Sequence, residues 1–208
     1  LVLFSNHVDK IDFIIKTLEN LYPEPEIPLD HKNTFTFLVA VMLSAQSTDK
    51  KVNEITPPLF AKADSAKKMS MLKVEEIKNL IRQIGLAPTK SKNIKKMSQI
   101  LVRKYNGKVP NSLEKLKELP GVGQKTASVI VSQIFNEPAF PVDTHIHRLA
   151  YRWKLSSGKN VVQTEKDLKR IFPVDLWNKL HLQIIFYGRE YCKSKKTKCS
   201  CVICSKIV

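Results

Sequence analysis

A turn with two glycines, set between two apolar helical patterns, constrains the fold of this chain more than any other feature. Residues 119–127 read LPGVGQKTA, with Gly121 and Gly123 one position apart and a helix-forming run after them. Pro and Gly before such a run predict a tight turn that opens a helix. Residues 112–119 carry leucines at helical spacing, which predicts a short amphipathic helix before the turn. The sequence therefore predicts a helix-hairpin-helix unit.

This unit suits an anion such as a phosphate. Gly121 and Gly123 let a ligand approach the backbone, and the unpaired N–H groups of the next helix point toward an anion. Lys125 lies in the first helical turn, where the helix macrodipole disfavours a cation and makes the neutral amine easier to reach. Such an amine can attack a sugar C1′ and form a Schiff base, and Asp143 could supply a carboxylate for the cationic intermediate. Spacing alone equally allows Lys125 only to contact a phosphate and Asp143 only to cap a helix.

The charge of the chain indicates a polyanionic partner. It has 35 basic and 19 acidic residues and a formal net charge of +16. Nucleic acid is the first candidate partner and an acidic membrane surface the second. No apolar run reaches the roughly 18 residues of a membrane span, and no signal-peptide pattern precedes Phe4. We therefore expect no membrane partner and a cytoplasmic location.

Apolar residues repeat at helical spacing along most of the chain. Neither strand alternation nor an internal repeat is evident, so we expect an all-α fold. Breaks are expected at the prolines of residues 23–28 and at residues 85–88. Helices are expected over residues 8–22, 34–43, 50–60, 66–71, 74–84, 112–119, 144–153, 161–172 and 176–187, and after residues 89 and 123.

A family resemblance is carried by residues 42–53 (MLSAQSTDKKVN), 119–127 (LPGVGQKTA) and 142–152 (VDTHIHRLAYR). Together these stretches resemble the endonuclease III family of helix-hairpin-helix DNA glycosylases. The resemblance runs in order along nearly the whole chain, from about Phe35 to Cys192. It places the family's catalytic lysine at Lys125 and its catalytic aspartate at Asp143.

The resemblance also implies which residues contact DNA. Gln46 matches the residue that fills the hole left by an extruded nucleotide, and Leu86 resembles the apolar wedge opposite the damaged base. Without the family, Gln46 would be part of a polar capping loop and Leu86 a core residue. The hairpin residues expected at the DNA are Gly121, Val122, Gly123 and Lys125. The lysines of residues 89–96 form either a solvated face or a track for phosphates: Lys90, Lys92, Lys95 and Lys96.

The architecture implied by the resemblance is two helical lobes with DNA in the cleft. Residues 27–137 would form a six-helix lobe that carries the hairpin and Lys125. Residues 1–26 and 138–208 would form a discontinuous second lobe that carries Asp143 and the cysteines. Catalysis would then need both lobes, held together in one monomer.

The function implied is that of a bifunctional DNA glycosylase and abasic-site (AP) lyase in base excision repair, acting on oxidised pyrimidines in double-stranded DNA of the nucleoid. Lys125 would displace the base, and β-elimination from the Schiff base would nick the strand. One alternative is the related monofunctional adenine glycosylase of mismatches. That branch has a catalytic Glu where this chain reads Ala40-Val41-Met42 and has no lysine at position 125, so both features disfavour it. A second alternative is a non-catalytic module that only anchors DNA.

All four cysteines of the chain lie near its C-terminal end, at Cys192, Cys199, Cys201 and Cys204. Such clustering predicts a metal site rather than a secreted disulfide framework. In the family, cysteines spaced C-x6-C-x2-C-x5-C hold a structural [4Fe–4S] cluster. Here the spacing is C-x6-C-x1-C-x2-C, so the cluster is the first hypothesis, and zinc or an empty site are its alternatives. A basic loop is expected between the first two cysteines, from Lys193, Lys195, Lys196 and Lys198.

Overall fold

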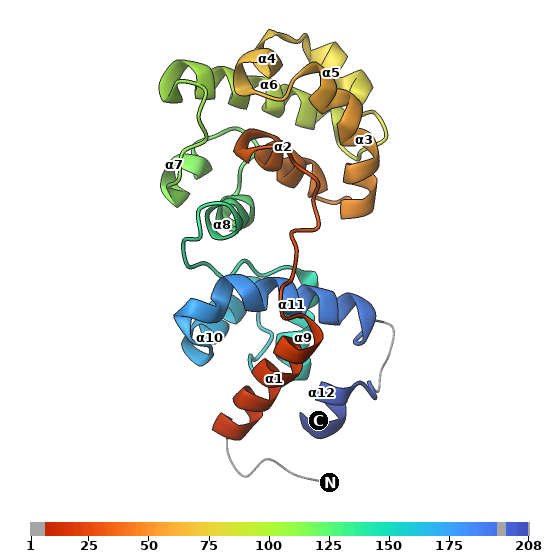
Figure 1. Ribbon diagram of the computed structural model, residues 1–208, viewed down its shortest axis with the longest axis vertical. Coiled ribbons are helices and arrows are strands. Elements are labelled where there is room, and N and C mark those ends of the chain that lie inside the picture. Colours follow the sequence, from red (N-terminus) through yellow and green to blue (C-terminus); the bar gives the residue numbers. More distant parts are fainter. Residues whose placement is uncertain (1–6, 195–198, 208) are drawn as a thin grey trace. The chain divides into compact units, whose positions relative to one another are not determined.

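A computed structural model describes residues 7–194 and 199–207, and these residues form the expected all-α fold (Figure 1). They contain twelve α-helices, one 3-10 helix and no strand. None of these helices is both long enough and apolar enough to cross a membrane. The helices are α1 (His7–Leu21), α2 (Thr34–Ser44), α3 (Asp49–Lys62), α4 (Ala66–Met71), α5 (Val74–Leu80), α6 (Ala87–Tyr105), α7 (Leu113–Lys117), α8 (Gln124–Gln133), α9 (Thr144–Arg152), α10 (Val161–Ile171), η1 (Val174–Leu176), α11 (Trp177–Glu190) and α12 (Val202–Ile207).

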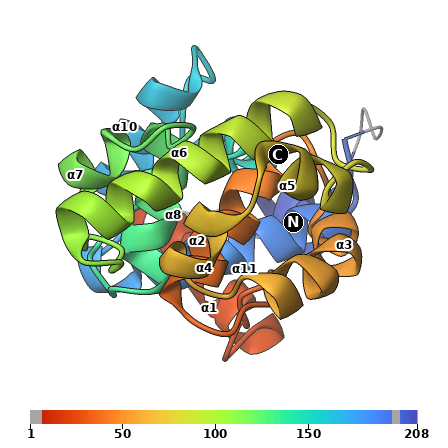
Figure 2. The same ribbon diagram turned by 90° about the horizontal axis from the view of Figure 1, so that it is seen from above.

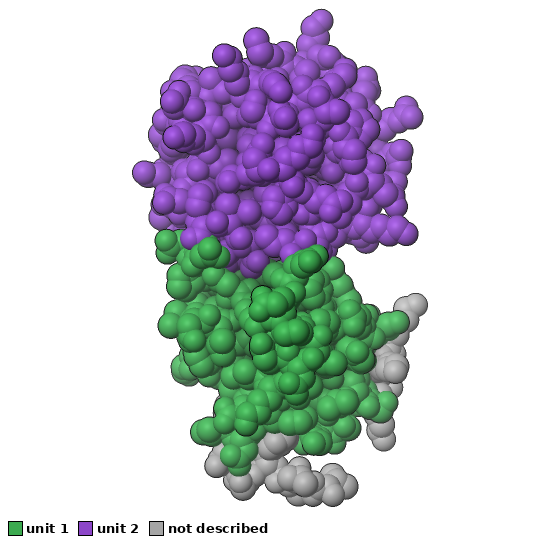
Figure 3. Space-filling model, viewed as in Figure 1, with its two compact units in different colours: residues 1–26, 136–208 green, residues 27–135 purple. Residues whose placement is uncertain are grey.

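The chain forms two compact units (Figure 3). Ile27–Phe135 is one unit, named here the hairpin unit, and it contains α2 to α8. Leu1–Glu26 and Asn136–Val208 make the other, named the cysteine unit, whose described residues contain α1 and α9 to α12. The hairpin unit thus has seven helices, one more than the six implied by the resemblance.

The core of the hairpin unit is built around α2. Its residues Phe35–Leu43 are all buried, as a helix that is apolar all round requires. A capping box fixes where α2 begins: Asn33 Oδ1 accepts from the Thr36 N–H at 2.9 Å, and Thr36 Oγ1 accepts from the Asn33 N–H at 3.0 Å. Helices α4 and α5 pack against α6, and α8 packs against α2 and α7 (Figure 2).

The core of the cysteine unit lies around α11, which packs against α1 and α9. Phe140, Trp153 and Tyr187 are almost fully buried within it. The rings of Trp153 and Tyr187 meet edge to face, with centroids 5.7 Å apart. This packing supports α9, the helix that begins directly after Asp143.

The helix expected over residues 74–84 is shorter than predicted. Helix α5 ends at Leu80, residues 81–86 form turns, and α6 begins at Ala87. Ile81 and Ile84 lie outside any helix and are still buried. Their apolar spacing matches that of a helix, although they belong to a turn that packs on the core. The break expected to include Pro88 ends before it, because the first turn of a helix does not need the N–H that proline lacks.

Candidate active site and metal centre

The hairpin joins α7 to α8 through the turn from Leu119 to Val122. The Val122 N–H donates to the Leu119 carbonyl at 3.1 Å, and Gly121 has a φ of 78°. Pro at the second position and Gly at the third are the residues that favour a type II turn. Leu119 and Val122 are 2% and 5% exposed, so their side chains anchor the turn in the core. Val122, expected at the DNA, therefore has its side chain buried and its N–H bonded within the turn.

The two hairpin glycines differ in whether the fold leaves room for a side chain. At Gly121 an added Cβ would lie 2.9 Å from Asn93 Nδ2 and 3.0 Å from Met42 Cε, and its φ is positive, so the fold itself requires glycine. At Gly123 an added Cβ would meet nothing within 4 Å, and its φ of −88° suits any residue. The absence of a side chain at Gly123 is thus not needed for packing. It leaves the N-terminal end of α8 open to a ligand.

Lys125 lies at the second position of α8, one residue after Gln124, and its side chain is exposed. Gly123 is the N-cap of this helix and has no side chain to bond the first N–H groups. Those groups and the helix macrodipole favour an anion at this end. The structure therefore brings an accessible amine and an anion-binding backbone together in one turn.

Asp143 is the N-cap of α9 in the cysteine unit, so Lys125 and Asp143 belong to different units. Its Oδ1 accepts from the Ile146 N–H at 2.8 Å. The capping role that the sequence allowed is thus present. This bond uses one carboxylate oxygen and leaves the second oxygen of a half-buried side chain for other chemistry.

Gln46 and Leu86 share a rare backbone conformation. Gln46 follows the end of α2 with a φ of 60°, and Leu86 is the N-cap of α6 with a φ of 63°. Both side chains are exposed, and Leu86 is 56% exposed although it is apolar. A left-handed conformation costs a residue with a Cβ about 1–2 kcal/mol. Leu86 is therefore not a core residue, and both side chains are presented outward at a cost in backbone strain.

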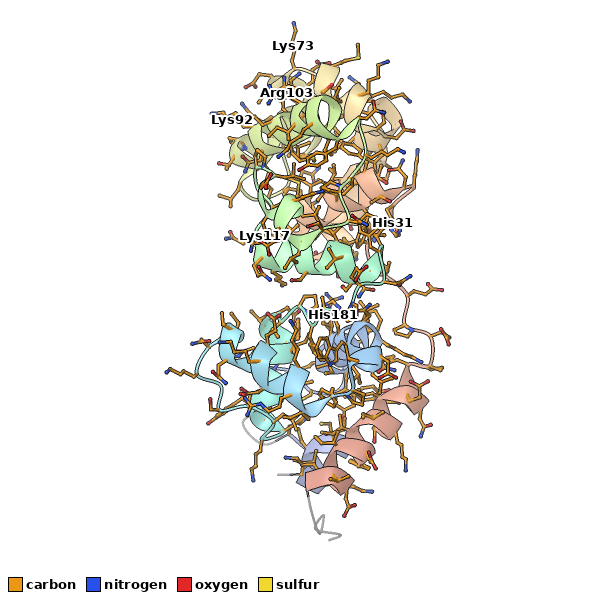
Figure 4. The ribbon with its side chains drawn as sticks, turned by 90° about the vertical axis from the view of Figure 1, so that its left-hand side faces the viewer. His31, Lys73, Lys92, Arg103, Lys117 and His181 are labelled. Atoms are coloured by element: carbon orange, nitrogen blue, oxygen red, sulfur yellow. The ribbon has the colours of Figure 1, made fainter. Side chains whose placement is uncertain are left out.

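The lysines of residues 89–96 do not form one solvated face. Lys92 and Lys96 are exposed, but Lys90 is only 7% exposed and Lys95 is half-buried. Sequence reasoning missed this division, because a run of lysines at the start of a helix carries no local mark of which one turns inward. Side chains that do project outward from the hairpin unit include Lys73, Lys92, Arg103 and Lys117 (Figure 4).

The four cysteines converge at the C-terminal end of the cysteine unit. Their sulfur atoms all lie within 4.8 Å of one another, and the Sγ atoms of Cys192 and Cys204 are 3.8 Å apart. Cys192 and Cys204 are buried, and Cys199 and Cys201 are half-buried. Helix α12 is held nearby by a hydrogen bond from the Ile203 N–H to Tyr187 Oη at 3.1 Å. Four thiols in this arrangement could bind a metal.

Two arginines of α9 hold the beginning of the cysteine loop. Arg148 Nη2 donates to the Cys192 carbonyl at 2.8 Å, and Arg152 Nη1 donates to Cys192 Sγ at 3.2 Å and to the Lys193 carbonyl at 3.0 Å. Hydrogen bonds from Cys204 and then from Arg152 lower the pKa of Cys192 to about 5. Sequence reasoning placed these arginines only on polar faces of the helix, although their i, i+4 spacing was a usable signal. Of the expected basic loop, Lys193 is exposed, and Lys195, Lys196 and Lys198 lie outside the described residues.

The class of protein follows from comparison of this chain with known families and structures. Residues 39–174 match the model of the HhH-GPD superfamily base excision DNA repair protein. Endonuclease III of Bacillus subtilis (strain 168) is 39% identical over 195 residues, which cover 93% of this chain and 89% of that protein. The fold also matches a solved non-covalent endonuclease III–DNA complex, with a TM-score of 0.91, 38% identity and coverage of 97% of this chain and 95% of that one. A trapped endonuclease III–DNA covalent intermediate matches with a TM-score of 0.90, 38% identity and the same coverage. The chain belongs to the endonuclease III family, which confirms the resemblance.

Proposed function

We propose that this protein is a bifunctional DNA glycosylase and abasic-site lyase that removes oxidised pyrimidines from duplex DNA in base excision repair. The observation that carries the proposal is the open N-terminal end of α8, where Lys125 stands exposed beside backbone N–H groups suited to a phosphate. A DNA strand supplies both a phosphate and a sugar C1′ to such a turn. The covalent intermediate solved for the related endonuclease III is in keeping with this chemistry.

Lys125 acts as the nucleophile in the proposed reaction. Its neutral amine attacks C1′ of the damaged nucleotide, the C1′–N bond to the base breaks, and the base leaves with a proton. Loss of the amine proton and opening of the sugar then give a Schiff base between Lys125 and C1′. Removal of a C2′ proton breaks the C3′–O bond and releases the 3′ strand, and water finally frees Lys125. The carboxylate of Asp143 stabilises the cationic intermediate and accepts or returns protons.

Gln46 and Leu86 act before this chemistry, when the damaged nucleotide leaves the stack. Extrusion costs a few kcal/mol, and it costs least for a damaged base. An exposed apolar side chain such as Leu86 can occupy the space between bases, and an exposed amide such as Gln46 can bond the orphaned partner. Both residues lie in turns of the hairpin unit and are exposed, as these roles require.

The adenine-glycosylase alternative lacks a carboxylate at the matching place. Ala40, Val41 and Met42 lie in α2 and are between 0% and 6% exposed, so this stretch offers only packed apolar groups. A non-catalytic DNA-binding module would use Lys125 only to contact a phosphate and would form no Schiff base. Strand nicking and borohydride trapping, described below, separate the proposed function from both alternatives.

The four cysteines form a structural metal site in this proposal, because no step transfers electrons. Around one tetrahedral ion with Zn–S bonds of about 2.3 Å, sulfurs lie about 3.8 Å apart. In a [4Fe–4S] cluster each cysteine binds a different iron, so the sulfurs must stand further apart than around one ion. The 3.8 Å between Cys192 and Cys204, with all sulfurs within 4.8 Å, supports one ion over the cluster. We therefore propose zinc, the alternative left open by the shortened cysteine spacing.

Borohydride trapping on a duplex with one abasic site tests the proposed function. The reagent reduces a Schiff base to a stable amine, so the protein should become covalently attached to the strand. Without reductant, the same incubation should nick the DNA. A protein that binds the duplex but neither nicks nor traps it would be either the non-catalytic module or the monofunctional glycosylase. Release of adenine from a mismatched duplex would then identify the monofunctional branch.

A further inference from the structure

Lys90 is a buried cation whose position the proposed chemistry does not explain. It lies in the first turn of α6 and is 7% exposed. Its Nζ donates to the Leu43 carbonyl at 2.8 Å and to the Ala45 carbonyl at 2.6 Å. These carbonyls belong to the last turn and the C-cap of α2, where the helix provides no N–H partner and its dipole favours a cation. Lys90 thus completes the C-terminal end of the most buried helix of its unit.

The Ala45 carbonyl has a direct consequence for Gln46. Because the peptide bond is planar, the Ala45 carbonyl and the Gln46 N–H lie in one rigid plane. Rotation of this plane about the next bond is the φ of Gln46, which has the strained value of 60°. A charge-assisted hydrogen bond of 2.6 Å to the carbonyl therefore helps to hold Gln46 in a conformation that it would otherwise leave.

Lys90 is also connected to the second candidate DNA residue. Its backbone N–H donates to the Leu86 carbonyl at 2.9 Å, in the turn where Leu86 has its own positive φ of 63°. The side chain of Lys90 thus bonds the Gln46 turn, and its backbone bonds the Leu86 turn. Both turns lie in the hairpin unit, and α6 provides the rigid support between them.

We propose that Lys90 is a positioning residue for Gln46 and Leu86. It holds their two turns so that Gln46 fills the gap in the DNA duplex while Leu86 separates the bases. The inference rests on the proposed function of these two side chains. It assigns to Lys90 a role in extruding the nucleotide and none in the bond-breaking steps. A simple capping role predicts instead that Lys90 affects stability alone.

Lys95 is a matched control on the same helix. Its Nζ also donates to two carbonyls, those of Ser70 and Leu72, at the end of another helix, α4. Loss of either ammonium removes two hydrogen bonds to a helix end. Only the loss of Lys90 releases the peptide that precedes Gln46.

The experiment compares Lys90→Met and Lys95→Met with the unmodified protein. We expect similar decreases in Tm for both variants. Single-turnover excision of an oxidised pyrimidine from duplex DNA should fall about tenfold or more in Lys90→Met, since small displacements of positioning groups have effects of this size, and stay within about twofold in Lys95→Met. Both variants should still nick single-stranded DNA with an abasic site, because no nucleotide has to be extruded from a duplex.

A second readout depends only on binding. Fluorescence of 2-aminopurine placed opposite the lesion reports how the orphaned base is stacked, and its change on binding should be lost in Lys90→Met and kept in Lys95→Met. Excision and fluorescence equal to those of the unmodified protein, or losses that follow Tm equally in both variants, would overturn the proposal.

If Lys90→Met does not fold, Lys90→Gln keeps an NH₂ donor group without the charge and should give an intermediate fluorescence change. A Lys90→Gln variant equal to the unmodified protein would count against the proposal. Should the unmodified protein show no trapping or nicking, the proposed function fails, and the fluorescence comparison still decides the role of Lys90.

Discussion

The hairpin and the cysteine site lie in different units, and different interactions hold them in place. The hairpin is held by buried Leu119 and Val122 and by a turn whose geometry glycine permits. The cysteine site is held by charged donors, Arg148 and Arg152, and places four thiols within 4.8 Å of one another. Because buried apolar side chains hold the hairpin, the backbone N–H groups at the start of α8 stay open for a ligand. The four thiols of the cysteine site could bind a metal instead.

The largest expected effect concerns the hairpin side of this comparison. Lys125→Gln replaces the amine by a neutral amide at an exposed position of α8, so the fold and the phosphate contacts should persist. Trapping with borohydride and strand nicking should disappear, while binding to duplex DNA, measured by fluorescence anisotropy, should change little. Lyase activity that survives this substitution would remove Lys125 from the role of nucleophile.

Asp143→Asn should have the next largest effect and extends the test to the cysteine unit. Asn is as good an N-cap as Asp, so the bond to the Ile146 N–H and the stability of α9 should be kept. Loss of the charge should reduce turnover by about 10²–10⁴-fold, the usual contribution of a group that moves protons. Tm and DNA affinity serve as controls. Turnover close to that of the unmodified protein would reduce Asp143 to a cap.

Metal removal should separate the two regions. We expect about one zinc and little iron per chain, in a colourless protein, as four thiolates around one ion imply. Chelation, or Cys204→Ser, should increase hydrogen exchange in residues 199–207 and leave the exchange of α8 unchanged, because the hairpin does not depend on the metal. Ser205→Ala is the neighbouring control and should keep the metal. A brown protein with several irons per chain would restore the [4Fe–4S] hypothesis.

The smallest effects distinguish the two hairpin glycines. Gly123→Ala adds a methyl group where nothing lies within 4 Å, so Tm should be unchanged while affinity for damaged and undamaged duplexes falls alike, by a few fold. Gly121→Ala should lower stability, by about 1–2 kcal/mol for the positive φ alone. Thermal unfolding and anisotropy measure both. A loss confined to damaged DNA in Gly123→Ala would contradict a phosphate contact at this turn.

The sequence by itself determined the features that depend on neighbouring residues. Pro120 and Gly121 specified the turn, apolar spacing specified most helices, and the clustered cysteines indicated a group that could bind a metal. The motifs around Lys125 and Asp143 were enough to identify the family. Turn chemistry and apolar periodicity act between neighbouring residues, so the sequence alone reveals them.

Only the tertiary structure decided which polar groups turn inward. Lys90 and Lys92 look alike in the sequence, yet only Lys90 is buried, because the carbonyls of Leu43 and Ala45 lack partners more than forty residues earlier in the chain. Likewise, Arg152 became a support of the cysteine site through Cys192, which lies forty residues away. Buried carbonyls and thiols must find donors wherever the fold places them. That requirement acts in space, so a local sequence pattern cannot reveal it.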